Sequence, residues 1–257
     1  MDYSTMFRLD GKHAVVIGCG GIGAELAEGL AAQGARLTCL DADEEVAAQA
    51  AARASGHVPA GSGRADVLDA SGLAEVAAGL GTVDVLVLTA ATNVRKPVLG
   101  YTAEEFERVV GLNLRGTFHA VQAFAPGMAH RGSGSIIALS SIRALAVEPG
   151  QGVYAATKAG MVQLLRALAA ELGPQGVRVN AVAPGVVETP LTEQIRADEA
   201  WGRAYAEKSA LGRWARPEEL VGAVAYLASD AASFVTGSQL LVDGGWTAID
   251  GRFTPPF

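Results

Sequence analysis

The chain has 257 residues, of which 50% are hydrophobic and 18% are charged, and its formal net charge is −7. This composition is too apolar for a disordered chain and is typical of one α/β domain with a large core. The acidic balance, without any Lys/Arg cluster, argues against a nucleic-acid partner. No uncharged apolar stretch has the length of a membrane span, so we expect no membrane partner either.

Cysteine and histidine usage bears on the compartment and on metal chemistry. Cys19 and Cys39 each lie in an apolar or glycine-rich stretch, so we expect buried thiols. Residues 1–9 carry charges and no apolar run, so no signal peptide is expected. The four histidines are scattered without metal-ligand spacing. We therefore expect a cytoplasmic protein with reduced thiols and no metal site.

Apolar runs of strand length alternate with Ala/Leu-rich helical segments along the whole chain. In chain order, the first half is expected to form a strand at 12–17, a helix at 22–33, a strand at 35–40, a helix at 44–54, a strand at 63–67, a helix at 70–80 and a strand at 83–88. The second half is expected to form a long helix at 103–129, a strand at 135–140, a helix at 153–172, a strand at 177–183, helical segments at 189–208 and 217–229, and a strand at 239–242.

This alternation predicts the fold class. Continuous apolar strands separated by helices indicate α/β architecture, with a single doubly wound (Rossmann) parallel sheet and helices on both faces. No linker or composition break divides the chain, so residues 1–257 are expected to form one domain. Within it, a helical substrate-loop excursion is expected at about 186–215.

A glycine-rich segment, residues 18–23, follows the first strand and opens the first helix. Glycine lets the backbone turn sharply and approach a pyrophosphate without a Cβ in the way. The backbone N–H groups and the positive end of the helix would then hold the phosphates. We assign cofactor binding to Gly18, Gly20, Gly21, Ile22 and Gly23; the alternative is an ordinary glycine-rich turn of an α/β protein.

Asp41 ends the second strand, where a carboxylate can accept hydrogen bonds from the adenosine ribose hydroxyls of a dinucleotide. Its charge would repel a 2′-phosphate, and no Arg or Lys stands in the glycine segment or directly after Asp41. The pattern therefore predicts NAD rather than NADP. The alternative role for Asp41 is to cap the helix at 44–54, and the two roles are compatible.

Tyr154 and Lys158 lie four residues apart on a predicted helix and so share one face. A free phenol has a pKa of about 10, and a nearby ammonium favours its phenolate. Ser141 follows the strand at 135–140, where its hydroxyl would point into the ligand crevice. Together they predict proton exchange with a carbonyl/alcohol pair, although a Tyr/Lys pair alone is more often a solvated helix face. The G-x-S-x-G elbow of a serine hydrolase is missing.

With these motifs in place, the chain resembles the short-chain dehydrogenase/reductase family over essentially its whole length. The matching positions follow the family's order and are the segment 18–23, Asp41, Asp66-Val67, Asn113, Ser141, Tyr154, Lys158, the segment 180–185 and Asp243-Gly244-Gly245. The resemblance implies an enzyme that moves a hydride between the nicotinamide ring of NAD and a secondary alcohol or ketone.

The resemblance also implies roles for individual residues. Tyr154 is expected to be the general acid/base, and Lys158 to lower its pKa and bind the nicotinamide ribose. Ser141 is expected to orient the substrate, and Asn113 to hold a water of the proton relay. Further cofactor contacts are expected at the adenine and the nicotinamide, from Asp66, Val67, Ala90, Ala91, Pro184, Gly185, Val187 and Thr189.

Two segments depart from the family's pattern. The usual Thr-Gly-x-x-x-Gly-x-Gly is here one residue shorter and follows Ile17. We expect pyrophosphate binding to survive, because Gly23 and the helix N-terminus remain. The usual Asn-Asn-Ala-Gly after the fourth strand is here Leu88-Thr89-Ala90-Ala91, and Thr89 is expected to replace part of the lost hydrogen bonding.

Substrate contacts are expected from the loops after Ser141 and Ala91 and from the excursion, which holds Trp201 and Tyr205. The predicted substrate residues are Arg95, Ser141, Arg143, Glu148, Gln151 and Tyr154. Arginine suits a carboxylate and the other donors and acceptors suit hydroxyls, so we expect a small polar substrate such as a sugar, sugar acid or other hydroxy acid. In the alternative, the two arginines face solvent, or pair with Glu148 or with another subunit. The tail 246–257 is expected to cover a pocket, its own or a neighbour's.

Two other functions and the assembly complete the expectations. The alternatives are a reductase or dehydrogenase of a cyclic, steroid-like or acyl substrate, and a catalytically idle dinucleotide-binding protein. The resemblance implies a homotetramer in which the helices at 103–129 and 153–172 pack against a neighbour's copies. The alternative is that their small residues pack only on the chain's own sheet.

Overall fold

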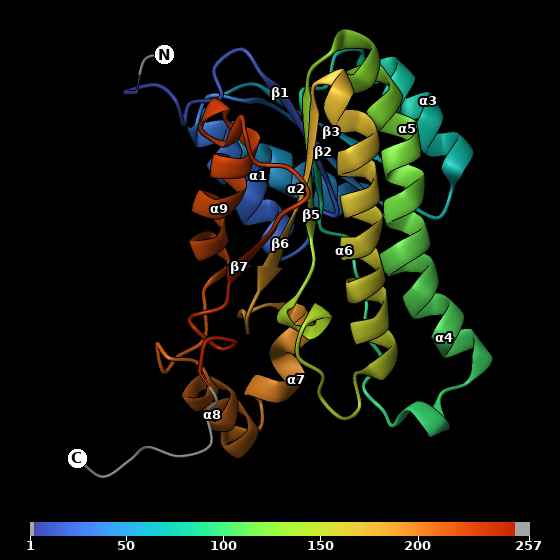
Figure 1. Ribbon diagram of the computed structural model, residues 1–257, viewed down its shortest axis with the longest axis vertical. Helices are drawn as coiled ribbons and strands as arrows, with labels where there is room; N and C mark the ends of the chain where they lie inside the picture. The colour runs from blue at the N-terminus through green and yellow to red at the C-terminus, as the bar shows by residue number, and fades with distance from the viewer. Residues whose placement is uncertain (1–2, 250–257) are drawn as a thin grey trace.

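The computed structural model of the protein describes residues 3–249. Its seven strands form one parallel sheet in the spatial order β3-β2-β1-β4-β5-β6-β7 (Figure 1). The strands are β1 (His13–Ile17), β2 (Arg36–Asp41), β3 (Ala60–Arg64), β4 (Val85–Leu88), β5 (Gly134–Leu139), β6 (Val177–Pro184) and β7 (Gln239–Val242). The strand order reverses between β1 and β4, so the predicted doubly wound sheet is confirmed.

Helices cover both faces of this sheet (Figure 1). One face carries α1 (Ile22–Ala32), α2 (Glu44–Ala54) and α9 (Val221–Ala228). The other carries α3 (Ala70–Leu80), α4 (Ala103–Val110), α5 (Gly116–Arg131) and α6 (Gly152–Leu172). Two short helices, α7 (Glu193–Arg196) and α8 (Glu199–Lys208), lie apart from both layers, at the bottom of the view.

Successive residues of the central strands enter opposite cores. On β1, Val15 packs in the core on the α5 and α6 side, whereas Val16 packs in the core on the α1 and α9 side. On β4, Leu86 likewise packs in the core on the α5 and α6 side and Val87 in the core on the α1 and α9 side. Because both sheet faces are covered, both sets of side chains are buried, and the strands are continuous apolar runs in the sequence.

Three predicted elements differ from the structure in detail. The third strand is Ala60–Arg64 rather than 63–67, because the apolar residues Ala65 and Val67, which drew the prediction, are buried in the loop that follows this edge strand. The predicted helix at 103–129 consists of α4, a π-helical segment at Gly111–Arg115 and α5. The predicted helix at 189–208 is divided, since Asp198 interrupts it and caps α8 through Trp201 N (3.0 Å).

Asn180 of β6 fastens the segment that leads into β7. It is fully buried, its Nδ2 donates to the Val235 carbonyl oxygen (2.9 Å), and its Oδ1 accepts from Ser238 N (3.0 Å). One amide thus satisfies both a backbone donor and a backbone acceptor that the sheet ladder leaves unpaired.

Replacing Asn180 with alanine should therefore destabilise the fold. Two hydrogen bonds are lost and two buried backbone groups lose a partner, so the free energy of unfolding should fall by about 2–4 kcal/mol in urea titrations at fixed protein concentration. The exposed Gln49→Ala of α2, outside the helices expected to pair between subunits, is the control and should change it by less than about 0.5 kcal/mol. A loss below about 1 kcal/mol for Asn180→Ala would contradict this role.

Candidate active site

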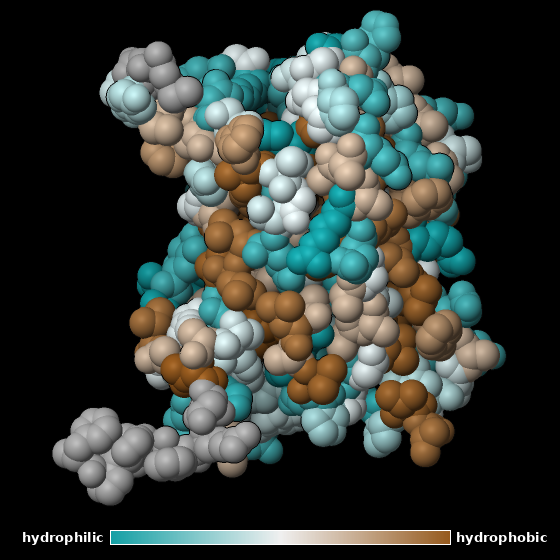
Figure 2. Space-filling view, viewed as in Figure 1, coloured by the Kyte–Doolittle hydropathy of each residue, from teal (hydrophilic) through white to brown (hydrophobic). Residues whose placement is uncertain are grey.

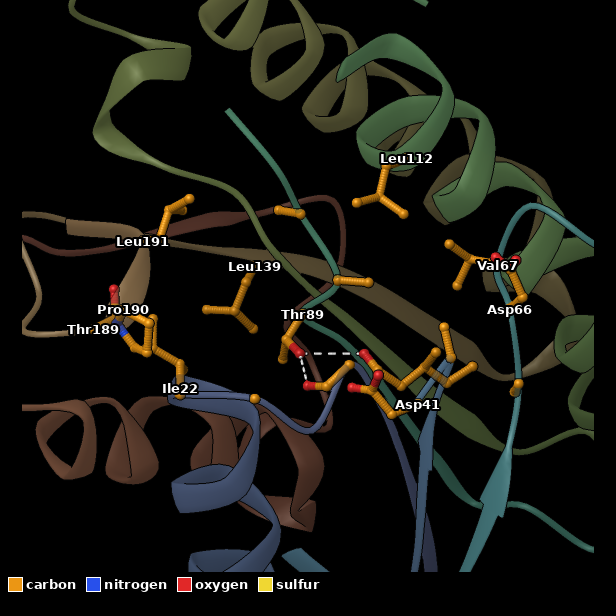
Figure 3. Close-up of a pocket in the computed structure, with 18 residues that line it drawn as sticks. Ile22, Asp41, Asp66, Val67, Thr89, Leu112, Leu139, Thr189, Pro190 and Leu191 are labelled. Atoms are coloured by element: carbon orange, nitrogen blue, oxygen red, sulfur yellow. Dashed lines mark hydrogen bonds between the residues drawn. The ribbon is translucent and has the colours of Figure 1, made fainter. Parts of the chain in front are cut away.

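The glycine-rich segment borders a cleft at the carboxyl ends of the strands (Figure 3). The cleft has a volume of about 390 Å³. Figure 3 shows Asp41, Asp66 and Val67 on one side and Thr189, Pro190 and Leu191 on the other. The predicted cofactor residues that line it are Gly18, Gly20, Gly21, Ile22, Asp41, Asp66, Val67, Ala90, Ala91 and Thr189.

Steric constraints at Gly18 and Gly23 fix the path of the glycine segment. Gly18 has φ +94°, and a Cβ there would lie 2.5 Å from the backbone nitrogen of Ala90. A Cβ on Gly23 would lie 1.9 Å from the Gly18 carbonyl oxygen. The turn therefore closes tightly although it is one residue shorter than the family's pattern, and the amino end of α1 stands at the cleft (Figure 3).

Thr89 joins the end of β4 to this turn. Its Oγ1 donates to the carbonyl oxygens of Ile17 (3.2 Å) and Gly18, and its backbone N–H donates to Ile17 as well (2.9 Å). Figure 3 marks the two side-chain bonds with dashed lines. Thr89 therefore braces the end of β4 against the glycine turn, and its replacement of the asparagine hydrogen bonds stays a prediction.

The Asp41 carboxylate stands at the end of β2 and organises the adjacent backbone. It accepts from Cys19 N (2.7 Å) and Asp43 N (3.0 Å), while the cap of α2 is Asp43. The capping alternative for Asp41 is thus wrong, and its carboxylate faces the cleft with lone pairs left for a ligand. Arg64, its register partner on β3, was not anticipated, and its Nε donates to the Ala42 carbonyl oxygen (3.1 Å).

The cleft fits a dinucleotide. A Cβ at Gly20 would meet nothing within 4 Å, so the glycine segment leaves open space beside the amino end of α1, where N–H groups are free for an anion. Beyond it, the apolar Val67 and the carboxylates of Asp41 and Asp66 suit a base and its ribose. These residues would hold the pyrophosphate and adenosine of a nicotinamide dinucleotide at the reversal point of the sheet, and Thr189 borders the part of the cleft left for the nicotinamide.

Ser141, Tyr154 and Lys158 come together where β5 ends. Ser141 follows β5, accepts from Arg143 N (3.1 Å) and lines the same small cavity as Tyr154. Lys158, one turn after Tyr154 on α6, donates from Nζ to the Leu139 carbonyl oxygen (2.7 Å) and lies 5.7 Å from the Tyr154 ring centroid. The tyrosine and lysine thus share a buried helix face, which excludes the solvated-face alternative.

Burial and charge act against each other on these groups. Burial raises the pKa of Tyr154, while the Ser141 hydroxyl and then the positive charges of Arg95 and Arg143 lower it. Burial also lowers the pKa of Lys158 to about 7. The predicted effect of Lys158 on the pKa of Tyr154 stays a prediction.

Asn113 lies in the π-helical segment and is fully buried. Its Oδ1 accepts from Thr92 N (2.8 Å), and its Nδ2 donates to the Thr92 carbonyl oxygen (2.9 Å) and to Thr157 Oγ1 (3.1 Å). The side chain therefore ties the loop after β4 to α6 beside Tyr154. A π turn locally widens the helix, a feature frequent at functional sites.

A second, smaller cavity of about 70 Å³ adjoins the cleft, and Leu191 lines both. Of the predicted substrate residues, it is lined by Arg95, Ser141, Arg143, Gln151 and Tyr154. Glu148 lies behind Arg143 and pairs with it (2.6 Å). For Arg143, the pairing alternative is therefore the correct one. Asn93, which also lines this cavity, was missed, and only its place two residues before Arg95 could have pointed to it.

Aromatic side chains pack against the two arginines that line this cavity; they come from the excursion and from Trp246. The Arg143 guanidinium lies 5.9 Å from the Tyr205 ring centroid and 5.5 Å from that of Trp246. Arg95 lies 5.7 Å from the ring centroid of Trp201. The described start of the predicted covering tail, Trp246, thus backs the cavity, while 250–257 lie outside the described residues.

The remaining predicted positions lie near the cleft without lining it. Gly185 lines the small cavity instead, and Gly23 lies against Gly18. Pro184 ends β6, and Val187 is buried in the α1-side core. The cleft residues not anticipated as contacts are Ile17, Ala42, Ala65, Thr89, Leu112, Leu139, Pro190 and Leu191. Most are apolar and carry no sequence signal beyond the strand or loop they occupy.

The described part of the chain holds no metal-binding cluster and no helix fit to cross a membrane, and its two cysteines are free. Among residues 3–249, no group of three or more His, Cys, Asp or Glu side chains is placed to hold a metal ion. Over the same stretch, none of the helices combines the length and apolar character needed to cross a bilayer. Cys19 and Cys39 are both buried free thiols, as expected.

Comparison with known proteins places this geometry among dehydrogenases. A family model described as enoyl-(acyl carrier protein) reductase matches residues 18–247. The galactitol 2-dehydrogenase (L-tagatose-forming) of Cereibacter sphaeroides is 40% identical over 96% of this chain and 99% of the relative. The gluconate 5-dehydrogenase of Gluconobacter oxydans is 35% identical over 96% and 99%. The crystal structure of a gluconate 5-dehydrogenase from Burkholderia cenocepacia, in complex with NADP and tartrate, is 36% identical with a TM-score of 0.91, covering 95% of this chain and 98% of that one.

The charges around Tyr154 give a testable consequence. Arg95→Gln should raise the pH at which Tyr154 ionises, because a positive charge that lowers its pKa is removed. The measurement is a spectrophotometric titration of phenolate absorbance, with the Tyr154→Phe background of each variant subtracted. Arg36→Gln, at the exposed start of β2, should leave the midpoint unchanged. An unchanged midpoint in Arg95→Gln would exclude this influence.

Proposed function

This chain belongs to the short-chain dehydrogenase/reductase family, and on that premise we propose that it is an NAD-dependent oxidoreductase that interconverts a secondary alcohol and a ketone on a small, sugar-type substrate. The single observation that carries the proposal is that Tyr154 and Ser141 line one small cavity, which adjoins the cleft that suits a dinucleotide. A catalytically idle binding protein has no need of this pair of hydroxyls beside the cleft.

The cofactor, when bound, supplies the ring carbon that accepts or gives the hydride. We assign its pyrophosphate to Gly18, Gly20 and Gly21 beside the amino end of α1. Its adenosine ribose is assigned to Asp41, and its adenine to Asp66 and Val67. On the nicotinamide side, Thr189 borders the cleft and Lys158 takes the ribose.

The chain's own residues would handle the proton. In the direction of oxidation, the Tyr154 phenolate removes the proton of the alcohol oxygen, while the Ser141 hydroxyl donates a hydrogen bond to that oxygen. In the direction of reduction, the Tyr154 phenol returns the proton. Asn113, which holds the loop after β4 against α6, keeps the proton path next to Tyr154 in place.

The size and lining of the small cavity support the substrate class. A volume of about 70 Å³ is far below the roughly 300 Å³ at which pockets for drug-sized ligands begin. Its lining includes polar groups from Arg95, Arg143 and Gln151, whereas a steroid-like or acyl substrate would need a larger apolar wall. The named relatives are a galactitol and a gluconate dehydrogenase, which supports a sugar, polyol or sugar acid over those alternatives.

We also propose that residues 1–257 act as one domain within a cytoplasmic homotetramer. Figure 2 shows apolar patches over β7 and α9 and along α5. The helical region at 103–129, which is expected to pack against a neighbour, exposes Phe106 of α4 and Phe118 of α5, and Leu241 of β7 is exposed as well. Such side chains favour packing against neighbouring copies. The two reduced cysteines support an intracellular compartment.

The reaction is tested with purified protein, NAD and a panel of polyols, sugars and sugar acids that includes galactitol, D-threitol and gluconate. Tyr154→Phe should lower kcat/KM at least about 100-fold, because the proton-transfer group is lost. NADH binding, followed by fluorescence, should stay close to wild type. Hydride transfer by no member of the panel, or substantial activity in Tyr154→Phe, would contradict the proposal.

The cofactor preference is tested separately, since the Burkholderia cenocepacia relative was crystallised with NADP. Wild type should prefer NAD, because the Asp41 carboxylate opposes a 2′-phosphate. Asp41→Ala should raise the NADP/NAD ratio of kcat/KM roughly tenfold, which corresponds to about 1.4 kcal/mol. Adding Arg64→Ala should reverse part of this gain, because Arg64 is the register partner of Asp41 and its positive charge would attract a 2′-phosphate. Equal use of both cofactors by the wild type would contradict NAD preference.

A further inference from the structure

A chain of hydrogen-bonded side chains forms one wall of the small cavity. It begins at Glu148, whose carboxylate pairs with Arg143 (2.6 Å) and accepts from the Tyr205 hydroxyl. Gln151 Nε2 donates to the same carboxylate, and Gln151 Oε1 accepts from Asn93 Nδ2 (3.0 Å). Asn93 and Gln151 both line the cavity with Ser141 and Tyr154.

The carboxylate fixes the direction of every bond in this chain. An ionised carboxylate only accepts hydrogen bonds, so Gln151 must turn its NH₂ group toward Glu148 and its carbonyl oxygen toward Asn93. Asn93 must then present its own NH₂ group to Gln151. Turning either amide over would set two acceptors against each other. The group that Asn93 has left is therefore its carbonyl oxygen.

That oxygen is without a partner. Asn93 Oδ1 is buried, and among residues 3–249 no hydrogen-bond donor reaches it. Buried acceptors are normally paired, so an unpaired one in a cavity wall indicates a donor that arrives with a ligand. The cavity is narrow, at about 70 Å³, so that donor must sit close to the atoms held by Ser141 and Tyr154.

We infer that Asn93 Oδ1 accepts a hydrogen bond from a substrate hydroxyl on the carbon next to the reacting one, and so selects vicinal diols, as in polyols, over simple secondary alcohols. The inference rests on the proposed function and deepens it. A carboxylate at this position is disfavoured, because it would set its oxygens against Oδ1. Arg143 does not oppose this selection, since its charge is already paired with Glu148.

The test uses three probes with one carbon skeleton: butane-2,3-diol, 3-fluorobutan-2-ol and butan-2-ol. The diol offers a donor beside the reacting carbon, the fluoro compound only a weak acceptor, and butan-2-ol neither. Wild type with NAD should prefer the diol over butan-2-ol by about tenfold in kcat/KM, the size of one net hydrogen bond. The fluoro compound should do no better than butan-2-ol.

The variants are Asn93→Leu, which keeps the volume but removes the acceptor, and Asn93→Ala, in case the leucine disturbs the wall. Both should bring the diol preference to within about twofold. The matched control Gln49→Leu changes an exposed amide of α2, outside the helices expected to pair between subunits, and should keep the wild-type ratio. NADH binding by each variant verifies that the fold is intact.

Two outcomes would overturn the inference and leave the proposed function standing: a diol preference that survives in both Asn93 variants, or a fluoro compound that reacts as well as the diol. If the wild type oxidises none of the three probes and no member of the panel of polyols, sugars and sugar acids, the proposed function fails and this inference falls with it.

Discussion

Parallel pairing of all seven strands is the constraint on which the rest of the molecule depends. In a parallel sheet every strand ends at the same edge, and neighbouring strands here end nearly in register, with Ile17 opposite Leu88 and Leu88 opposite Ala138. The residues that follow these strands are therefore brought side by side although they are far apart in the chain. The glycine turn, Thr89 and Ser141 each come directly after a strand end, and together they form the site.

At this edge, polar groups must work inside a largely apolar core. Lys158 is buried and is held by a carbonyl oxygen rather than by a carboxylate, so its charged form is poorly compensated and its pKa falls to about 7. Burial also raises the pKa of Tyr154, so both groups are shifted toward their neutral forms. The pKa of Lys158 thereby comes close to neutral pH, whereas the pKa of Tyr154 moves away from it, and the Ser141 hydroxyl and the charges of Arg95 and Arg143 act to lower the latter.

The small cavity shows how one buried carboxylate can organise its surroundings. Glu148 neutralises Arg143, orients Tyr205 and sets the direction of the Gln151–Asn93 pair. The guanidinium of Arg143 is also stacked against two aromatic rings, one of them from Trp246 near the end of the chain. Arg143 is therefore a fixed part of the wall, and its charge is already paired. A substrate would meet mainly the amide groups of Asn93 and Gln151 and the guanidinium of Arg95.

The sequence by itself determined the sheet, the glycine turn, and the placement of Asp41, Ser141, Tyr154 and Lys158, because each follows from local periodicity or from a strand end that topology carries to a known edge. It did not determine the bounds of the third strand, because Ala65 and Val67 are apolar owing to their burial in the loop that follows the strand. Nor did it determine the pairing of Arg143 with Glu148 or the free acceptor of Asn93. Those depend on which side chains from separate loops meet, and only tertiary packing decides such partners, because spacing along the chain places no constraint on contacts between loops.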